Sequence, residues 1–134
     1  MVTVNFRLGI FGSLNLSSLN GYTEEYKDSI NLNVLDQIRA LEWINENIEN
    51  FGGNPENVTI FGQSAGGGAV SALLTVDKAK GLFHKVIAES GNIFNREISI
   101  EQSLKNAEKV FDILEVSSLE ELLAITDDEI RENY

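Results

Sequence analysis

The sequence contains no cysteine, and it has only one proline, one histidine and one tryptophan. The absence of cysteine excludes disulfide bonds and cysteine-ligated metal sites, and it leaves the redox compartment open. No apolar run is long enough to cross a membrane. The first residues show neither a charged leader nor a cleavage-site pattern, so we predict no signal peptide. Cytoplasmic and secreted locations both stay open.

Positive charge is also scarce. Ten Lys and Arg residues stand against 21 Asp and Glu residues, and the formal net charge is −11 at pH 7. A chain this acidic is a poor partner for nucleic acid or for an anionic membrane, and we predict neither. The imbalance is steepest in residues 92–134, which hold 11 acidic and 4 basic side chains. We interpret this segment as a solvated helical surface.

The length of 134 residues and the 43% share of apolar residues suit one domain with a hydrophobic core. Predicted strands and helices alternate along the chain. β-branched and apolar runs predict strands near 2–6, 57–61 and 84–89. Apolar residues at steps of three and four predict helices near 31–49 and 65–75. This order predicts a parallel α/β sheet. The second strand is apolar on both faces, which favours helices on both sides of that sheet.

The remaining segments have their own patterns. Residues 8–30 are rich in Gly, Ser, Asn and Tyr and predict a loop. Apolar residues at helical spacing over 104–114 predict an amphipathic helix. Two capping-box patterns follow, and each predicts the start of a short helix. They pair Ser118 with Glu121 and Thr126 with Glu129.

A serine between two glycines follows the second predicted strand at once, in Gly62-Gln63-Ser64-Ala65-Gly66. Where a buried strand turns sharply into a helix, the serine is strained and the residues two positions away must be small. The turn presents the hydroxyl outside the sheet, and the N–H groups at the helix start lie where an oxyanion would form. We therefore predict Ser64 as a nucleophile and the N–H of Ala65 as an oxyanion donor.

Other interpretations of these residues stay open. The turn also suits an inert serine or a phosphate-cradling loop, although no Lys-Ser/Thr pair follows as in a P-loop. His84 stands at the entry to the third predicted strand, at the edge of a parallel sheet opposite the catalytic groups, and we interpret it as structural. Glu89 ends that strand and is a weak candidate acid, because no later histidine is present. Asp36 is placed in the first turn of a helix, where a carboxylate favours the dipole.

The sequence resembles the type B carboxylesterases, the carboxylesterase/cholinesterase group, over nearly its whole length. The block around Ser64 is the most specific part of this resemblance. The matching segments are Val4–Gly12, Asn31–Gln37, Ala40–Trp43, Asn47–Ile48, Phe51–Pro55, Val58–Gly67, Gly81–His84 and Glu89–Gly91. Because the chain begins directly with a predicted strand and matches only part of the family's pattern, we expect it to be an internal piece of a larger enzyme.

The resemblance implies a partial α/β-hydrolase fold over residues 1–134. In it, Ser64 forms the acyl-enzyme and Ala65 supplies an oxyanion N–H. The family's glycine-rich oxyanion loop would then lie upstream of these residues, and its acid and catalytic histidine downstream of them. The resemblance also implies non-catalytic positions for His84 and structural roles for Arg7, Asp36 and Trp43.

Three residues depart from the family's pattern. Gln63 stands where a Glu usually precedes the nucleophile. Asn33 replaces a usual Gly, and since Asn tolerates a positive φ better than most residues, we expect the same backbone shape there. Ala69 replaces a serine that commonly follows the nucleophile, which removes one supporting hydrogen bond.

These inferences together predict a serine carboxylic ester hydrolase that acts on a small-molecule ester and needs no cofactor or metal. We expect these 134 residues to lack the catalytic acid and the catalytic histidine. Two alternatives stay open: an inactive, cholinesterase-like adhesion or interaction module, and a non-functional truncated product. The oligomeric state is not predicted.

Overall fold

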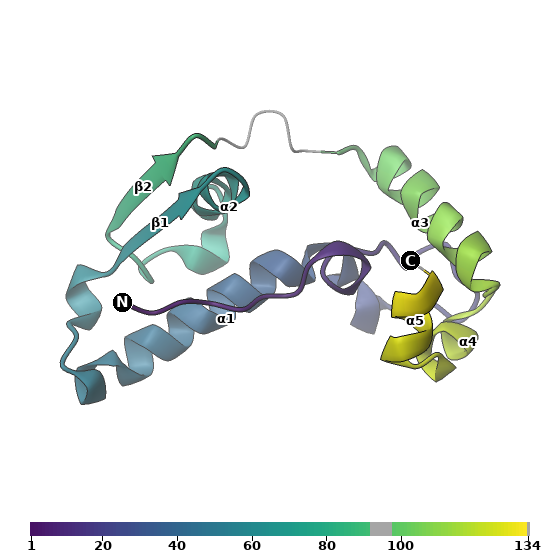
Figure 1. The fold of residues 1–134 in the computed structure, drawn as a ribbon, viewed down its shortest axis with the longest axis horizontal. Coiled ribbons are helices and arrows are strands. Elements are labelled where there is room, and N and C mark those ends of the chain that lie inside the picture. Colours follow the sequence, from purple (N-terminus) through teal and green to yellow (C-terminus); the bar gives the residue numbers. More distant parts are fainter. Residues whose placement is uncertain (92–97, 134) are drawn as a thin grey trace. The chain divides into compact units, whose positions relative to one another are not determined.

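The computed structural model describes residues 1–91 and 98–133, which divide into two compact units (Figure 1). Unit 1 contains Met1–Phe6 with Asn33–Glu97, and unit 2 contains Arg7–Leu32 with Ile98–Tyr134. The strands are β1 (Thr59–Gln63) and β2 (Lys85–Glu89). The α-helices are α1 (Leu32–Asn47), α2 (Ala65–Leu73), α3 (Ile100–Leu114), α4 (Leu119–Ala124) and α5 (Asp127–Asn133).

Unit 1 is built on a parallel pair of strands. β1 and β2 are in register from Thr59 opposite Lys85 to Gln63 opposite Glu89. The crossover between them carries α2, which packs against both strands. The predicted parallel strand–helix–strand unit is therefore confirmed, with β1 two residues further along than the sequence pattern placed it.

One face of this sheet carries the core of unit 1. Ile60 packs against a buried cluster to which α1 contributes Ile38, Leu41 and Ile44 and α2 contributes Leu73. The opposite face is open, because Phe61 is 58% exposed and its register partner Ile87 is 51% exposed. Among the described residues, helices are found on the Ile60 face and not on the Phe61 face.

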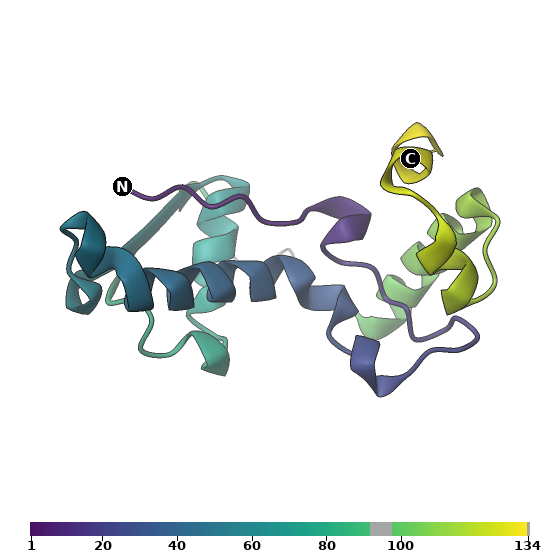
Figure 2. The ribbon, with the colours of Figure 1, turned by 90° about the horizontal axis from the view of Figure 1, so that it is seen from below.

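The strand predicted over residues 2–6 is also not found. Figure 2 draws this segment as a plain trace, and it pairs with no strand among the described residues. Its side chains, with those of β1, α1 and α2, line a hollow of about 980 Å³ within unit 1. A β-branched run favours an extended backbone, but a strand also needs a hydrogen-bonded neighbour. The described chain places none beside it.

The start of α1 differs in two details from the sequence-based expectation. Asn33 lies inside the helix and is not among the residues with positive φ. Its side chain accepts a hydrogen bond from the N–H of Val34 instead, at 2.7 Å. Asp36 lies in the second turn rather than the first, because the α-helix begins at Leu32. After α1, the left-handed Gly52 (φ 76°) ends the 3₁₀ turn Ile48–Phe51.

Unit 2 joins the predicted loop to the acidic tail. Leu16 and Leu19 from the loop pack against Ala107 and Phe111 of α3 and against Leu119 of α4. A buried hydrogen bond of 2.8 Å runs from Asn15 Nδ2 to Ser103 Oγ. The backbone also connects the two segments, because the N–H of Leu119 donates to the carbonyl of Asn20 at 2.8 Å. The loop is therefore ordered by packing on helices that come about a hundred residues later.

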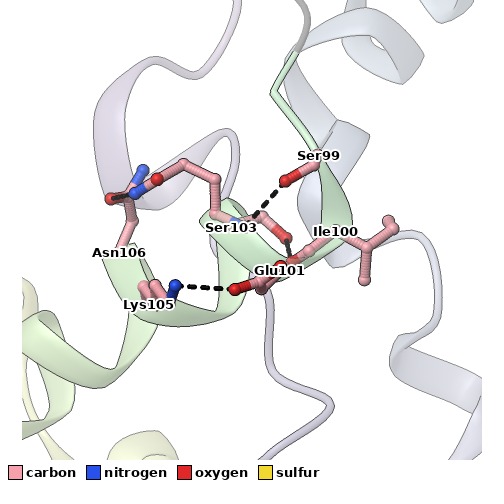
Figure 3. A network of polar contacts seen from close by, with 7 residues as sticks. Ser99, Ile100, Glu101, Ser103, Lys105 and Asn106 are labelled. Atoms are coloured by element: carbon pink, nitrogen blue, oxygen red, sulfur yellow. Dashed lines mark hydrogen bonds and ion pairs between the residues drawn. The ribbon is translucent and has the colours of Figure 1, made fainter.

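The helices of unit 2 have capped starts, and α3 begins at Ile100, four residues before the apolar pattern predicted. Ser99 caps α3 by accepting the N–H of Gln102 at 3.1 Å, and Figure 3 shows the polar contacts of this first turn. There, Ser103 Oγ donates to the carbonyl of Ile100 at 2.7 Å, and Lys105 pairs with Glu101 at 2.7 Å. Both predicted capping boxes are present, each with reciprocal bonds between hydroxyl residue and glutamate. They open α4 and α5, at Ser118 with Glu121 and at Thr126 with Glu129.

Candidate active site

The site predicted from the sequence lies where β1 gives way to α2. β1 ends at Gln63, α2 begins at Ala65, and Ser64 alone forms the turn, with φ 54° and ψ −114°. A positive φ in a residue with a β-carbon is unfavourable, and strain of this kind costs about 1–3 kcal/mol. The strained strand-to-helix turn that the glycine–serine motif predicts is therefore formed.

The two glycines of the motif stand in different surroundings. A β-carbon on Gly62 would lie 2.4 Å from both the carbonyl carbon and the carbonyl oxygen of Gly66. A β-carbon on Gly66 would meet nothing within 4 Å. The turn closes because Gly62 lets the backbone of α2 fold back onto β1. Gly66 contributes its own backbone to that contact and leaves open space on its other side.

The side chain of Ser64 is presented rather than used for capping. Serine is a favoured N-cap residue, but Ser64 makes no side-chain hydrogen bond to the first N–H groups of α2. Ser64 and Ala65 are both exposed. The N–H groups in the first turn of a helix have no partner within the helix, and the dipole there favours negative charge. The geometry thus places a hydroxyl beside N–H groups that suit an oxyanion.

The residues at the end of β2 contact the backbone of the Ser64 turn. The N–H of Ser64 donates to the carbonyl of Glu89 at 2.8 Å. Ser90, the next residue, has a positive φ of 50°. Gly91 then lies so close to the turn that a β-carbon on it would be 2.2 Å from the carbonyl oxygen of Ser64. Sequence reasoning did not predict this contact, and the only signal for it was the Glu-Ser-Gly run after the third predicted strand.

His84 lies at the other end of the sheet. It immediately precedes β2, and its Nδ1 accepts the N–H of Val58, which precedes β1, at 3.2 Å. At about 3.3 Å per strand residue, roughly 16 Å separates His84 from the level of Glu89 and Ser64. This geometry supports the structural interpretation of the histidine, since its ring holds the start of the strand pair and lies far from the serine hydroxyl.

The two carboxylates weighed as candidate acids occupy unlike positions. Glu89 pairs with Gln63 at the end of the sheet next to Ser64, and its side chain is exposed. Asp36 lies on α1. Ser64 therefore forms a strained, exposed turn at the start of a helix, and His84, the one histidine in residues 1–91 and 98–133, lies at the other end of the sheet.

No cluster of His, Asp and Glu side chains that could hold a metal ion occurs in the part of the chain that the structure describes. Within the same residues, every helix is too short or too polar to cross a lipid bilayer.

A family comparison agrees with this geometry. The model of the carboxylesterase family matches residues 1–127. The chain belongs to the carboxylesterase family. Its matched residues run through both units and include the whole strand–serine–helix turn.

Individual carboxylesterases are closely similar to parts of the chain. The para-nitrobenzyl esterase of Bacillus subtilis (strain 168) is 49% identical over 117 residues, which are 87% of this chain and 22% of that protein. Liver carboxylesterase 1 of Mus musculus is 48% identical over 95 residues, 71% of this chain and 16% of that protein. The chain thus spans about a fifth of the length of these curated relatives.

A solved structure shows the same fold. A carboxylesterase of Geobacillus stearothermophilus superposes with a TM-score of 0.90 at 37% identity, covering 96% of this chain and 27% of that one. The parallel strands with their flanking helices are accordingly part of an α/β-hydrolase fold. This confirms the fold class predicted from the sequence.

Proposed function

We propose that this chain belongs to a serine carboxylic ester hydrolase in which Ser64 carries the acyl group. The observation that supports the proposal most is the backbone of Ser64, strained at φ 54° between β1 and α2 with its side chain exposed and not engaged in capping. Family membership supports the reaction class, since the similar proteins are named as esterases. The substrate is a small-molecule carboxylic ester.

The proposed reaction is acyl transfer in two halves. A general base takes the proton of the Ser64 hydroxyl while Oγ bonds to the ester carbonyl carbon, and the carbonyl oxygen becomes an oxyanion. The N–H of Ala65 donates to that oxyanion. As the carbon–oxygen bond to the alcohol breaks, the alkoxide takes the proton from the base. Water then attacks the acyl-enzyme in the same way, which releases the acid and restores the Ser64 hydroxyl.

The base and its orienting acid are proposed to come from outside these 134 residues, together with further oxyanion donors. Two observations support this. His84 is the only histidine of the sequence, and its ring accepts a backbone N–H at the far end of the sheet. The matched relatives are about five times as long as the matched segment. These 134 residues would then carry the nucleophile of a site that is completed by other residues.

Both units are proposed to belong to one α/β-hydrolase domain. Each has its own buried cluster. The family match extends over residues 1–127 and so includes residues of both. Unit 1 would provide the nucleophile and the sheet, and unit 2 a helical part of the same domain.

A second candidate function is a binding or adhesion module that keeps the fold without catalysis. The observation that favours it is the lack of a histidine near Ser64 in the described residues. A hydroxyl without a base is a weak nucleophile. The two candidates differ in whether Ser64 ever becomes acylated.

Pre-steady-state kinetics test the proposed function. The native protein, in the length in which its source makes it, is mixed with a short-chain nitrophenyl ester. We expect a burst of nitrophenol stoichiometric with protein, followed by slower turnover, because the acyl-enzyme accumulates. Ser64→Ala is expected to remove both phases. Hydrolysis without a burst that survives in Ser64→Ala would exclude the acyl-enzyme through Ser64, and absence of hydrolysis in the native protein would favour the binding module.

A further inference from the structure

The N–H of Ser64 is held by the neighbouring strand. It donates to the carbonyl of Glu89 at 2.8 Å. The last residue pair of the parallel ladder is Gln63 opposite Glu89, so this bond extends the ladder onto the strained residue itself. The peptide group that leads into Ser64 is therefore oriented by β2 and not by the helix that follows.

The carbonyl of Ser64 is confined from the other side. It accepts the first α-helical bond of α2, from the N–H of Gly68 at 3.0 Å. Gly91 packs against the same group: a β-carbon there would lie 2.2 Å from the Ser64 oxygen, 2.7 Å from Gly68 N and 2.9 Å from Gly67 C. All three are backbone atoms, which cannot move aside as a flexible side chain could. No residue larger than glycine fits here without shifting the serine turn.

Ser90 connects these two contacts through a second strained conformation. Its φ is 50°, and it is one of three non-glycine residues with positive φ in the described ranges, with Ser64 and Glu115. The left-handed residue turns the chain out of β2 and brings Gly91 under α2. Strained backbone of this kind persists only where surrounding structure holds it. Ser90 thus lies between Glu89 and Gly91, the two residues whose backbones contact Ser64.

We propose that the turn Glu89–Gly91, which lies outside the Gly-x-Ser-x-Gly motif, positions the nucleophile by clamping both peptide groups of Ser64. The inference rests on the proposed function of Ser64. Glu89 acts through its carbonyl, Gly91 through its lack of a side chain, and Ser90 through its backbone conformation. These are positioning residues, and none of them contacts the reacting atoms.

The test is the acylation rate of Ser64 in the native protein. Gly91→Ala is expected to slow fluorophosphonate labelling and to lower kcat by about 100-fold with KM nearly unchanged, since a shift of about 1 Å at a reacting group has effects of this size. Ser90→Gly is expected to label faster than Ser90→Val, because glycine adopts a positive φ readily and a β-branched residue does not. If Gly91→Ala does not fold, the comparison of labelling rates between Ser90→Gly and Ser90→Val tests the proposal instead.

Gly53→Ala is the matched control. Its β-carbon would meet Ile48 Cγ1 at 2.5 Å, so it disturbs unit 1 without contacting the serine turn. It is expected to lower stability and to leave kcat unchanged. If Gly53→Ala and Gly91→Ala slow labelling equally, the effect is one of stability alone, and the proposal that Glu89–Gly91 positions Ser64 is wrong. Labelling of Gly91→Ala at the wild-type rate would also overturn it.

A second readout separates this inference from the proposed function. Hydrogen exchange at the Ser64 amide is expected to be slow in the wild type and fast in Gly91→Ala, while the amides of β1 stay protected. This holds even if the wild type is never acylated, in which case the proposed function fails and the clamp is still measured. Equal exchange at Ser64 in the two proteins would overturn the clamp whatever the activity.

Discussion

A β-carbon on Gly62 would lie 2.4 Å from the carbonyl carbon of Gly66, so the two glycines of the serine motif are in backbone contact. The contact is not symmetrical. The space beside the α-carbon of Gly66 is empty to 4 Å in the described structure. The motif requires small residues at both positions, but the physical requirement for glycine is concentrated at Gly62.

We predict that alanine has opposite effects at these two positions. Gly62→Ala forces backbone against backbone and should lower the free energy of unfolding by about 3 kcal/mol, the upper end of the usual cost of overpacking. Gly66→Ala adds a better helix former to open space and should change stability by less than about 1 kcal/mol, in the stabilising direction. Urea denaturation measures both values. Equal losses in the two variants would show that Gly66 is also confined.

The capping boxes predict a stability that depends on pH. Hydrogen bonds from the N–H and hydroxyl of Ser117, and then from Ser118, lower the pKa of Glu121. Bonds from the N–H and hydroxyl of Thr126 lower the pKa of Glu129. Because each folded pKa lies below the unfolded value, the stabilisation is complete above the unfolded pKa, near 4.5, and is lost as the pH falls through the folded values.

Carboxyl NMR titration checks this prediction directly. The Glu121 and Glu129 resonances should titrate below the ordinary glutamate value of 4.5, and α4 and α5 should lose helix signal over the same pH range. Glu121→Gln should remove the pH dependence of α4 and leave that of α5. Titration of both carboxyls at the ordinary glutamate value would contradict the capping geometry.

We also predict that the 134-residue chain by itself does not hydrolyse esters at an enzymatic rate. Its one histidine holds the N–H of Val58 at the far end of the sheet. Loss of the base alone in a well-studied serine protease lowers turnover by about a million-fold. The assay compares the wild-type chain with Ser64→Ala and His84→Ala on a nitrophenyl ester. Burst kinetics that both substitutions abolish would show that His84 is the base after all.

Much of unit 1 could be predicted because its signals are local. The apolar period gave α1 and α2, and Gly62 with Ser64 gave the strained turn, since each depends on residues adjacent in sequence. The prediction of a strand over residues 2–6 was wrong, because a strand forms only beside a neighbouring strand and the local sequence pattern does not show whether one is present. The positive φ expected at Asn33 is not found either, because this residue lies within α1 and its side chain accepts the N–H of Val34.

The support beneath the serine could not be predicted for the same reason. Gly91 contacts Ser64 only because β1 and β2 pair in one particular register. The Glu-Ser-Gly run has no periodicity and no known chemistry of its own. Its contact with the Ser64 turn depends on the parallel pairing of β1 and β2.

The most direct test of this account is covalent labelling of the native protein with a fluorophosphonate, followed by peptide mapping. A strained, exposed serine that carries the acyl group should be the labelled residue. We predict one equivalent of label on the peptide that contains Ser64, and none in Ser64→Ala. Label that persists in Ser64→Ala, or that maps to another residue, would contradict the assignment of Ser64 as the nucleophile.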